Sequence, residues 1–422
     1  MKRRLPAALA ALALAACAPD SPAPASFEGG LGPADRALAY RSLFRTLTAT
    51  PDGDSDRAYA ALRDEVTALA AGAEDRLEVM VENLDSEIVA QALVDAAARG
   101  VAVRVVGDVD RREQKGFALL EAAGIAPVYG DGAILWNGVF GEDLIERTGE
   151  DNRLTHNVFI ADRHRVVSLS AGFPPDGADL AQQGFAAISE VIARDFGNAF
   201  DQLHGGVFAT TLTYYEQGVP SDTNNRTAYP VEDGVVELWF GPQEPIIKEL
   251  IDRIYGARAA VWIATPELRN SELARAVRYK AEAGFDVRVI VGARVDARAE
   301  AGALEATLDA IAAARDDNPP AFRVNPAIGG TLLVIDGQPD PRSRGAVRWP
   351  GIALVSTTPL FEAVPYYVED VTQDGLVLAA QPSDRFIDGH LWGAREGDPA
   401  EPSPDYTALR AQYEALFAAG EE

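Results

Sequence analysis

Two stretches of the chain carry polar side chains in the same order, each at the ends of short apolar runs. Residues 153–173 read RLTHNVFIADRHRVVSLSAGF, which predicts two β-strands joined by a turn at Asp162. Residues 329–360 contain GGTLLVIDG and, after a polar insertion, GIALVSTTPL, with Asp336 at the corresponding place. The polar residues that this pattern singles out are His156, Asn157, Asp162 and Ser170 in the first stretch and Thr331, Asp336, Ser356 and Thr358 in the second.

These residue types suit acid–base or nucleophilic chemistry on an oxyanion. Histidine serves as a nucleophile or base, and amide and hydroxyl groups hold negatively charged oxygens. The candidate catalytic residues are His156, Asp162 and Asp336, and the candidate ligand-binding residues are Asn157, Ser170, Thr331, Ser356 and Thr358. A structural interpretation stays open for each: a half-exposed strand histidine, aspartates that cap turns, and polar strand ends. The sequence has no P-loop, GxSxG, HExxH or clustered His/Cys set, so we expect no metal and no cofactor.

The elements around these stretches form an internal repeat. Residues 35–71 predict helices broken near residues 50–56. Residues 76–84 then predict a strand, and Asp85 is expected to cap a helix that ends at Gly100, before the next strand. The same strand, helix, glycine and strand recur in the second half, where Gly284 matches Gly100 without a gap. Gene duplication is the simplest interpretation of the repeat, beside two unrelated α/β units that share a common helix–glycine–strand pattern. The alternation of strands and helices implies a mainly parallel portion of sheet covered on both faces, and we expect a mixed sheet in each half.

The sequence resembles the phospholipase D superfamily. The resemblance rests on ALVDAAARGVAVRVVGD, on RLTHNVFIAD with VVSLSAG, and on the same order in the second half. It implies an α/β fold of two phospholipase-D-like α/β/α sandwich halves related by a pseudo-twofold axis, with one site at their seam. In that family each half carries HxKxxxxD followed by GSxN. One histidine is the nucleophile toward phosphorus, the other is the general acid, and the lysine, serine and asparagine groups hold the phosphate.

The chain departs from this pattern at the residues that matter most. No histidine is followed two residues later by lysine. A gapless alignment on Asp162 places Thr155 and Asn157 at the His and Lys positions, whereas a one-residue deletion keeps His156. Alignment on Asp336 places Gly329 at the second His position. The chain's four histidines are His156, His164, His204 and His390.

We therefore expect a catalytically degenerate phospholipase-D-like protein that acts as a binding or scaffolding module. The alternative is a phosphodiesterase acting on a phospholipid or another phosphodiester, with a non-standard site around His156. A third possibility, a purely structural protein, predicts an apolar seam without a pocket. The formal net charge of -26 disfavours binding to nucleic acid, whose phosphates it repels.

The N-terminus has the features of a bacterial lipoprotein signal. Residues 1–17 contain a basic start, a short apolar run and LAAC, which resembles a lipobox ending at Cys17. An ordinary secretory signal with an incidental cysteine is the alternative. The prediction is a lipid anchor on Cys17 in the cell envelope, with Ala18 favouring the outer membrane. The expected divisions are a signal peptide (1–17), a flexible spacer (18–34), a first half (35–210), a linker (211–233) and a second half (234–422).

Overall fold

The computed structural model describes residues 42–50, 56–130, 136–137, 144–145, 153–176, 180–204, 228–232, 234–241, 246–293, 299–314, 319–343, 347–357, 360 and 387–421. Cys17, the predicted spacer, Thr358 and most of the predicted linker lie outside these residues. In the part of the chain that is described, no helix is both long and apolar enough to cross a bilayer.

The first half forms a seven-stranded mixed sheet, in the described residues, with the order β1-β10-β9-β8-β2-β3-β4. Strands β2, β3 and β4 are parallel, and the others join antiparallel. Its elements are β1 (Leu43–Ala49), α2 (Asp56–Ala71), β2 (Arg76–Val81), α3 (Glu87–Ala98), β3 (Ala102–Asp108), η2 (Val109–Arg111), α4 (Lys115–Ala122), β4 (Val128–Gly130), β5 (Trp136–Asn137), β6 (Leu144–Ile145), β7 (Arg153–Leu154), β8 (Asn157–Ala161), β9 (Arg165–Leu169), β10 (Gln182–Ile188) and α5 (Glu190–Gln202).

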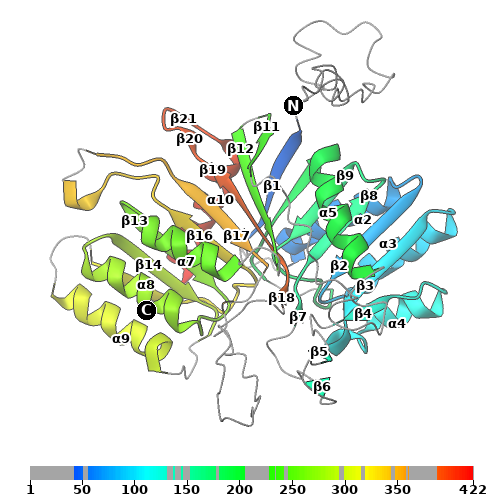
Figure 1. Cartoon of the computed structure of the whole chain (residues 1–422), viewed down its shortest axis with the longest axis horizontal. Coiled ribbons are helices and arrows are strands. Elements are labelled where there is room, and N and C mark those ends of the chain that lie inside the picture. Colours follow the sequence, from blue (N-terminus) through cyan, green and yellow to red (C-terminus); the bar gives the residue numbers. More distant parts are fainter. Residues whose placement is uncertain are drawn as a thin grey trace, which may run out of the picture. The chain divides into compact units, whose positions relative to one another are not determined.

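The second half forms an eight-stranded sheet, again in the described residues, with the order β11-β12-β19-β17-β16-β13-β14-β15 (Figure 1). Its elements are β11 (Ala228–Val231), β12 (Gly234–Phe240), α7 (Ile246–Gly256), β13 (Ala260–Thr265), α8 (Ser271–Glu282), β14 (Asp286–Val291), α9 (Ala299–Ala313), β15 (Ala321–Val324), β16 (Thr331–Ile335), η4 (Pro341–Ser343), β17 (Ile352–Ser356), β18 (Ile387–Asp388), β19 (His390–Arg395), β20 (Gly397–Asp398), β21 (Glu401–Pro402) and α10 (Pro404–Ala419).

The two sheets repeat one strand order. Apart from the added edge strand β11, the order β12-β19-β17-β16-β13-β14-β15 corresponds strand for strand to β1-β10-β9-β8-β2-β3-β4. The predicted α/β fold of two related halves is therefore confirmed.

Local sequence explains the repeated helices, with two corrections to the sequence predictions. Helix α3 is capped by the hydroxyl of Ser86, which accepts from the Val89 N–H, and not by Asp85. Both Gly100 and Gly284 have a positive φ, which glycine adopts without strain at a helix end. Residues 43–49, expected within a helix, instead form strand β1, because LFRTLTA alternates buried and exposed side chains as a sheet edge requires.

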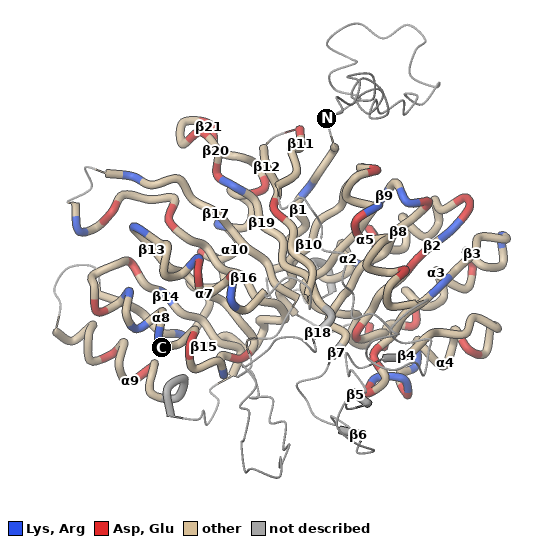
Figure 2. The backbone as a smooth tube through the Cα atoms, viewed as in Figure 1, with Lys and Arg blue, Asp and Glu red and all other residues tan. Residues whose placement is uncertain are grey.

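Three hydrophobic cores lie in layers. One covers the face of the first sheet that packs on α2, α3 and α4, and a second covers the face of the other sheet that packs on α7, α8 and α9. The third, which we call the seam core, contains the inner faces of both sheets and the helices α5 and α10. Charged residues of both signs are spread over the elements of both halves (Figure 2).

Backbone and side-chain contacts also join the halves. Ala181, just before β10, forms a parallel bridge with Ile328, just before β16. Helix α10 of the second half reaches β1 of the first, where the Asp405 carboxylate accepts from the Thr46 N–H at 2.7 Å. The Gln412 amide donates to the Ala49 carbonyl at 2.8 Å. The seam is thus a packed interface.

Candidate functional site

The alternation of side chains along β8 decides which predicted residues face the seam. Val158 and Ile160 belong to the seam core, whereas Phe159 and Ala161 belong to the outer core of the first half. His156 has the parity of the seam-facing residues, and Asn157 has the opposite parity. Of the two alternative alignments, only the one-residue deletion therefore puts a histidine at the seam.

A chain of three polar side chains crosses the seam at this point. Nδ1 of His156 lies 3.0 Å from Nδ1 of His390, the first residue of β19, and the two rings are nearly parallel. Nε2 of His390 lies 2.6 Å from Oγ of Ser168 on β9. The backbone of His390 is held by Thr357, whose hydroxyl accepts from the His390 N–H at 2.9 Å. One histidine from each half thus meets the other, directly and without a gap.

The surroundings of the two rings are aromatic and dry. His156 is 1% exposed and His390 is fully buried. Phe196 of α5 packs edge-on against His390, and Phe240 of β12 lies beside His156. Burial lowers the pKa of His156 to about 3 and holds the pKa of His390 well below its ordinary value, with a further lowering from His156. Both rings are therefore neutral at physiological pH.

The connectivity Ser168–His390–His156 is that of a nucleophile, a base and a residue that orients the base. If Ser168 donates to Nε2 of His390, then His390 must donate from Nδ1 to Nδ1 of His156; the reverse direction is equally consistent with the distances. Ser168 is, however, fully buried and paired with strands on both sides. In this arrangement the three groups bind one another, and neither Ser168 nor His390 has exposed surface.

The strand ladders give the second-half equivalents of these residues. The ladder of β8 with β9 ends at its turn with the pair Ala161–Arg165, and the ladder of β16 with β17 ends at its turn with the pair Ile335–Ile352. These two pairs are therefore equivalent. We counted residues from these pairs along each strand, and then across the sheet to β10 in the first half and β19 in the second. The count gives the counterpart of each seam position. The equivalent pairs are His156 with Gly330, Ser170 with Thr357, and Gln183 with His390. Thr357, and not Ser356, is thus the counterpart of Ser170.

Gly330 occupies the place where a second motif histidine would stand. A Cβ atom on Gly330 would lie 2.6 Å from Cβ of Ser170 and 2.9 Å from Oε1 of Gln183, with Oγ of Ser170 closer still. Ser170 and Gln183 are both buried, and the Nε2 of Gln183 has no hydrogen-bond partner among the residues that the structure describes. The first half therefore fills the space that a side chain at position 330 would need.

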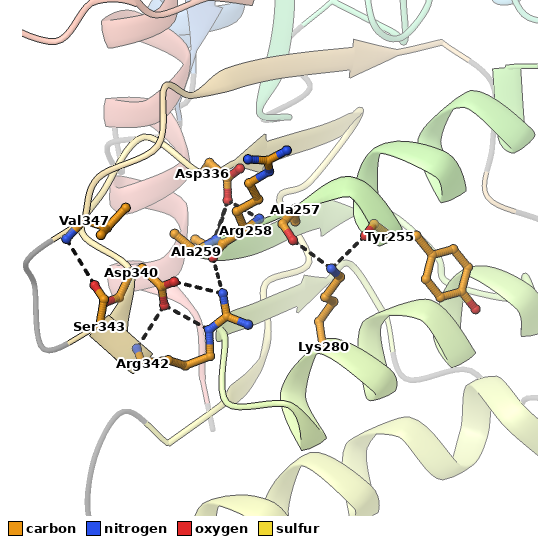
Figure 3. Close-up of polar contacts among 11 residues, drawn as sticks. Tyr255, Ala257, Arg258, Ala259, Lys280, Asp336, Asp340, Arg342, Ser343 and Val347 are labelled. Carbon is orange, nitrogen blue, oxygen red and sulfur yellow. Dashed lines mark hydrogen bonds and ion pairs between the residues drawn. The ribbon is translucent and has the colours of Figure 1, made fainter.

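The two motif aspartates lie at the opposite ends of their strands, where they bind backbone. Asp336 Oδ1 accepts from the N–H groups of Arg258, Ala259 and Ala260 at 2.8, 2.6 and 3.2 Å (Figure 3). Asp162 accepts in the same way from residues 74–76 at the start of β2. Both have a positive φ at the turn. Each carboxylate stabilises a turn, in agreement with the interpretation of these two aspartates as turn caps.

The remaining predicted residues face away from the seam or are not described. Asn157 accepts from the Glu82 N–H at 3.1 Å and donates to the Thr155 carbonyl. Oγ1 of Thr331 lies 3.0 Å from Oγ1 of Thr265, and Ser356 pairs with Thr331 in the ladder. Thr331 and Ser356 share the parity of residues in the outer core of the second half. Of the predicted residues that the structure describes, His156 and Ser170 alone reach the seam.

Sequence reasoning missed His390, Ser168 and Gln183. Their only signal was position: Ser168 lies two residues before Ser170 and shares its face, whereas His390 and Gln183 belong to strands whose pairing the sequence does not specify. The structural interpretation of His156 as a half-exposed strand histidine is wrong, because the side chain is buried. In the described residues, no group of three or more His, Cys, Asp or Glu side chains is placed to hold a metal ion.

Comparison with known proteins supports the fold. No family model and no curated protein matches this sequence. The solved structure of phosphatidylserine synthase from Haemophilus influenzae is 12% identical, with 92% of this chain and 90% of that chain covered and a TM-score of 0.53. A polyphosphate kinase from Porphyromonas gingivalis is 12% identical with a TM-score of 0.48, and this chain, 90% covered, spans half of that chain's length. Nuc, a phospholipase D family member from Salmonella typhimurium, is 15% identical with a TM-score of 0.28 over 38% of this chain and 93% of that chain.

The repeated sheet order, the seam between the halves and the similarity to the synthase define a two-lobed protein with the phospholipase-D-like fold. The resemblance drawn from the sequence is confirmed at the level of the fold.

Proposed function

We propose that this protein is a phospholipase-D-like envelope protein that has lost the standard phosphodiesterase reaction and acts as a binding or scaffolding module. The observation that carries the proposal is the direct contact of 3.0 Å between Nδ1 of His156 and Nδ1 of His390. In-line phosphoryl transfer between two histidines places the phosphorus and the leaving oxygen between the nucleophile and the acid. The two nitrogens must then lie at least about 6 Å apart. A phosphoryl group has no room between these rings.

Charge supports the same conclusion. Phosphoryl transfer needs positive groups on the equatorial oxygens, but the residues two positions after His156 and Gly330, where the motif lysines would stand, are Val158 and Leu332 of the seam core. A general acid must also carry a proton before it can donate one. Burial keeps both histidines neutral, because it lowers the pKa of each.

A second candidate function is a phosphodiesterase that uses His156 and His390 after the seam has opened. The observation in its favour is that the two histidines come from different halves, as the resemblance requires of a nucleophile and an acid. Its substrate would be a phospholipid or another phosphodiester. This candidate requires the rings to separate by about 3 Å or more before substrate enters.

The test is hydrolysis of phospholipid in mixed micelles and of bis(p-nitrophenyl) phosphate by the full-length protein in detergent. We expect no turnover above the protein-free blank. The variants His156→Ala and His390→Ala run beside the wild type, with His164→Ala, an exposed turn residue, as the matched control. Turnover that falls by about 10^3-fold or more in either seam variant, and not in the control, would overturn the proposal and establish the second candidate.

We also propose that a lipid on Cys17 anchors the protein to the cell envelope. The protein would then bind its partners at the membrane, and we expect no nucleic acid among them. The support is the LAAC sequence after a basic and apolar start. Metabolic labelling with a fatty-acid probe should mark the wild type and not Cys17→Ser. A label retained by Cys17→Ser would contradict lipid attachment at Cys17. Cross-linking in intact cells tests the scaffolding role: discrete adducts are expected for the anchored wild type, and monomer alone would contradict it.

A further inference from the structure

The polar chain across the seam joins two halves that also meet there through apolar side chains and through the backbone pairing of β18 with β7, where Asp388 pairs with Leu154. His156 belongs to the first half and His390 to the second, and Ser168 returns the connection to the first half. Thr357 fixes the backbone of His390 within its own half, with hydrogen bonds to both its N–H and its carbonyl. Any change in the bond between the two rings therefore acts directly on the contact between the halves.

We propose that His156, His390 and Ser168 form an acid-sensitive latch, which holds the seam closed while both rings are neutral and releases it when they are protonated. The proposal concerns regulation of the seam and does not depend on whether the protein has lost its phosphodiesterase activity.

The hydrogen bond explains why a second proton must break the latch. A bond between two Nδ1 atoms needs one donor and one acceptor, which neutral imidazoles supply. One proton is tolerated, because a charged His390 donates from both nitrogens, to His156 and to Ser168. When both rings are charged, each Nδ1 carries a hydrogen, so the bond cannot form. Two like charges would then lie about 3 Å apart in an apolar core, an arrangement that water would relieve. The pKa of each ring is lowered only in the closed seam, and a released ring titrates near its ordinary value of about 6.5. Acid therefore favours the open seam once the pH falls below about 6.5, well above the pKa of about 3 that His156 has in the closed seam.

The surroundings do not supply a compensating negative charge. The elements packed on the rings contribute Phe196 from α5 and Phe240 from β12. The titratable groups on the adjoining elements are Glu82, whose backbone N–H donates to the His156 carbonyl, Asp195 of α5, and Asp108 of β3, whose buried carboxylate accepts from the Leu154 N–H at 2.9 Å. Burial raises the pKa of Asp108 to about 6, so this carboxyl gains a proton in the same pH range and then carries no charge. The Asp195 carboxylate is held by the Tyr229 hydroxyl at 2.7 Å and by Arg194. No carboxylate in the described residues pairs with either imidazole, so protonation leaves the charge exposed to its apolar neighbours.

Opening should be visible at the strands that the latch joins. Trp392 lies two residues beyond His390 on the seam-facing side of β19, where it packs on Phe185 and Phe44. Release of the rings loosens this aromatic cluster first. The outer layers, including α3 and α8, contact the sheets through separate cores and should keep their protection.

The experiment is hydrogen exchange measured by mass spectrometry on the full-length protein in detergent between pH 7.5 and 4.5, corrected for the intrinsic exchange rate. In the wild type, peptides covering 153–160 and 387–395 should lose protection at the acid end by about tenfold or more, while α3 and α8 peptides stay protected. His156→Asn keeps a hydrogen-bonding group near Nδ1 and cannot be charged, so it should move this loss by one pH unit or more toward acid. His164→Asn should behave as the wild type.

Several results would overturn the latch. Unchanged protection at the seam down to pH 4.5 in the wild type would do so. So would simultaneous loss in the seam and in α3 and α8, since that is global unfolding. Equal pH profiles for the wild type and His156→Asn would remove the histidine pair as the cause. Because His156→Asn could weaken the fold for other reasons, His390→Gln, which retains a donor toward Ser168, provides an independent second variant with the same expected shift.

Discussion

A single methyl group at position 330 tests whether the seam is as closed as the packing indicates. Gly330→Ala adds a Cβ atom that would lie 2.6 Å from Cβ of Ser170 and 2.9 Å from Oε1 of Gln183. The backbone at Gly330 is not in the positive-φ region, so the penalty comes from contact and not from strain. Overpacking of this kind costs about 1–3 kcal/mol of unfolding free energy.

A second substitution isolates the cause of that penalty. Ser170→Gly removes the two nearest of these atoms, Oγ and Cβ of Ser170, and leaves only the Oε1 of Gln183 at 2.9 Å, which is the end of a flexible side chain that can shift. In that background Gly330→Ala should become close to neutral, or even stabilise by about 0.4–1 kcal/mol because alanine restricts the unfolded chain. The coupling energy between the two positions is then about 1.5 kcal/mol or more, far above the error for independent sites.

The assay is urea unfolding of the four proteins in the cycle, followed by circular dichroism and by tryptophan fluorescence, whose coincidence checks two-state behaviour. Gly256→Ala at the end of α7 is the matched control, because its added Cβ meets nothing within 4 Å and should stabilise by about 0.5–1 kcal/mol. Additive effects of Ser170→Gly and Gly330→Ala would refute the reasoning, since they would mean that the space beside position 330 is open.

Four further substitutions test what individual carboxylates contribute to stability. Asp336→Ala removes an acceptor of three backbone hydrogen bonds and should lower the unfolding free energy, measured by thermal unfolding, by about 3 kcal/mol. Asp162 is more exposed, so Asp162→Ala should cost less. Equal costs for the two variants would contradict the argument from burial. Burial raises the pKa of Asp108 to about 6, so the stability it contributes is complete below about pH 4 and is lost as the pH rises through 6. Asp108→Asn should therefore gain about 2 kcal/mol relative to the wild type between pH 4 and pH 7, and a constant difference would refute the shift. Glu237 is buried beside the guanidinium groups of Arg253 and Arg395. Glu237→Gln should therefore lower the unfolding free energy by about 3 kcal/mol. A loss below about 1 kcal/mol, as for a surface ion pair, would show that the charge is not buried.

The fold could be predicted from the sequence because its signals are local and occur twice. The helix, glycine and strand around Gly100 and Gly284 specify one supersecondary unit, and the aspartates that follow the core strands mark the turns. Strand β1 was missed because its alternation covers only seven residues beside a long helix-forming segment. The sequence predicted Asp85 as the N-cap of α3, but the N-cap is Ser86. Both residue types suit an N-cap, so the sequence could not distinguish them.

The candidate site was predictable only in its first half. His156 was identified, but its partner His390 lies 234 residues away and is brought close by the pairing of β19 with β17 and β12. No local pattern encodes that pairing. The polar insertion between β16 and β17 also hid the strand register, which is why Ser356 was matched with Ser170 in place of Thr357. Local chemistry names candidates, whereas long-range pairing decides which of them meet.

The reach of α10 into the first half has a consequence for the order in which the chain becomes folded during synthesis. The bonds from Asp405 to Thr46 and from Gln412 to Ala49 join residues 359 and 363 positions apart. These bonds form only after residues 404–419 have been synthesised, so β1 of the first half gains these partners late, from a helix of the second half. A chain cut before residue 404 lacks both partners of β1, whose edge can then pair with other molecules.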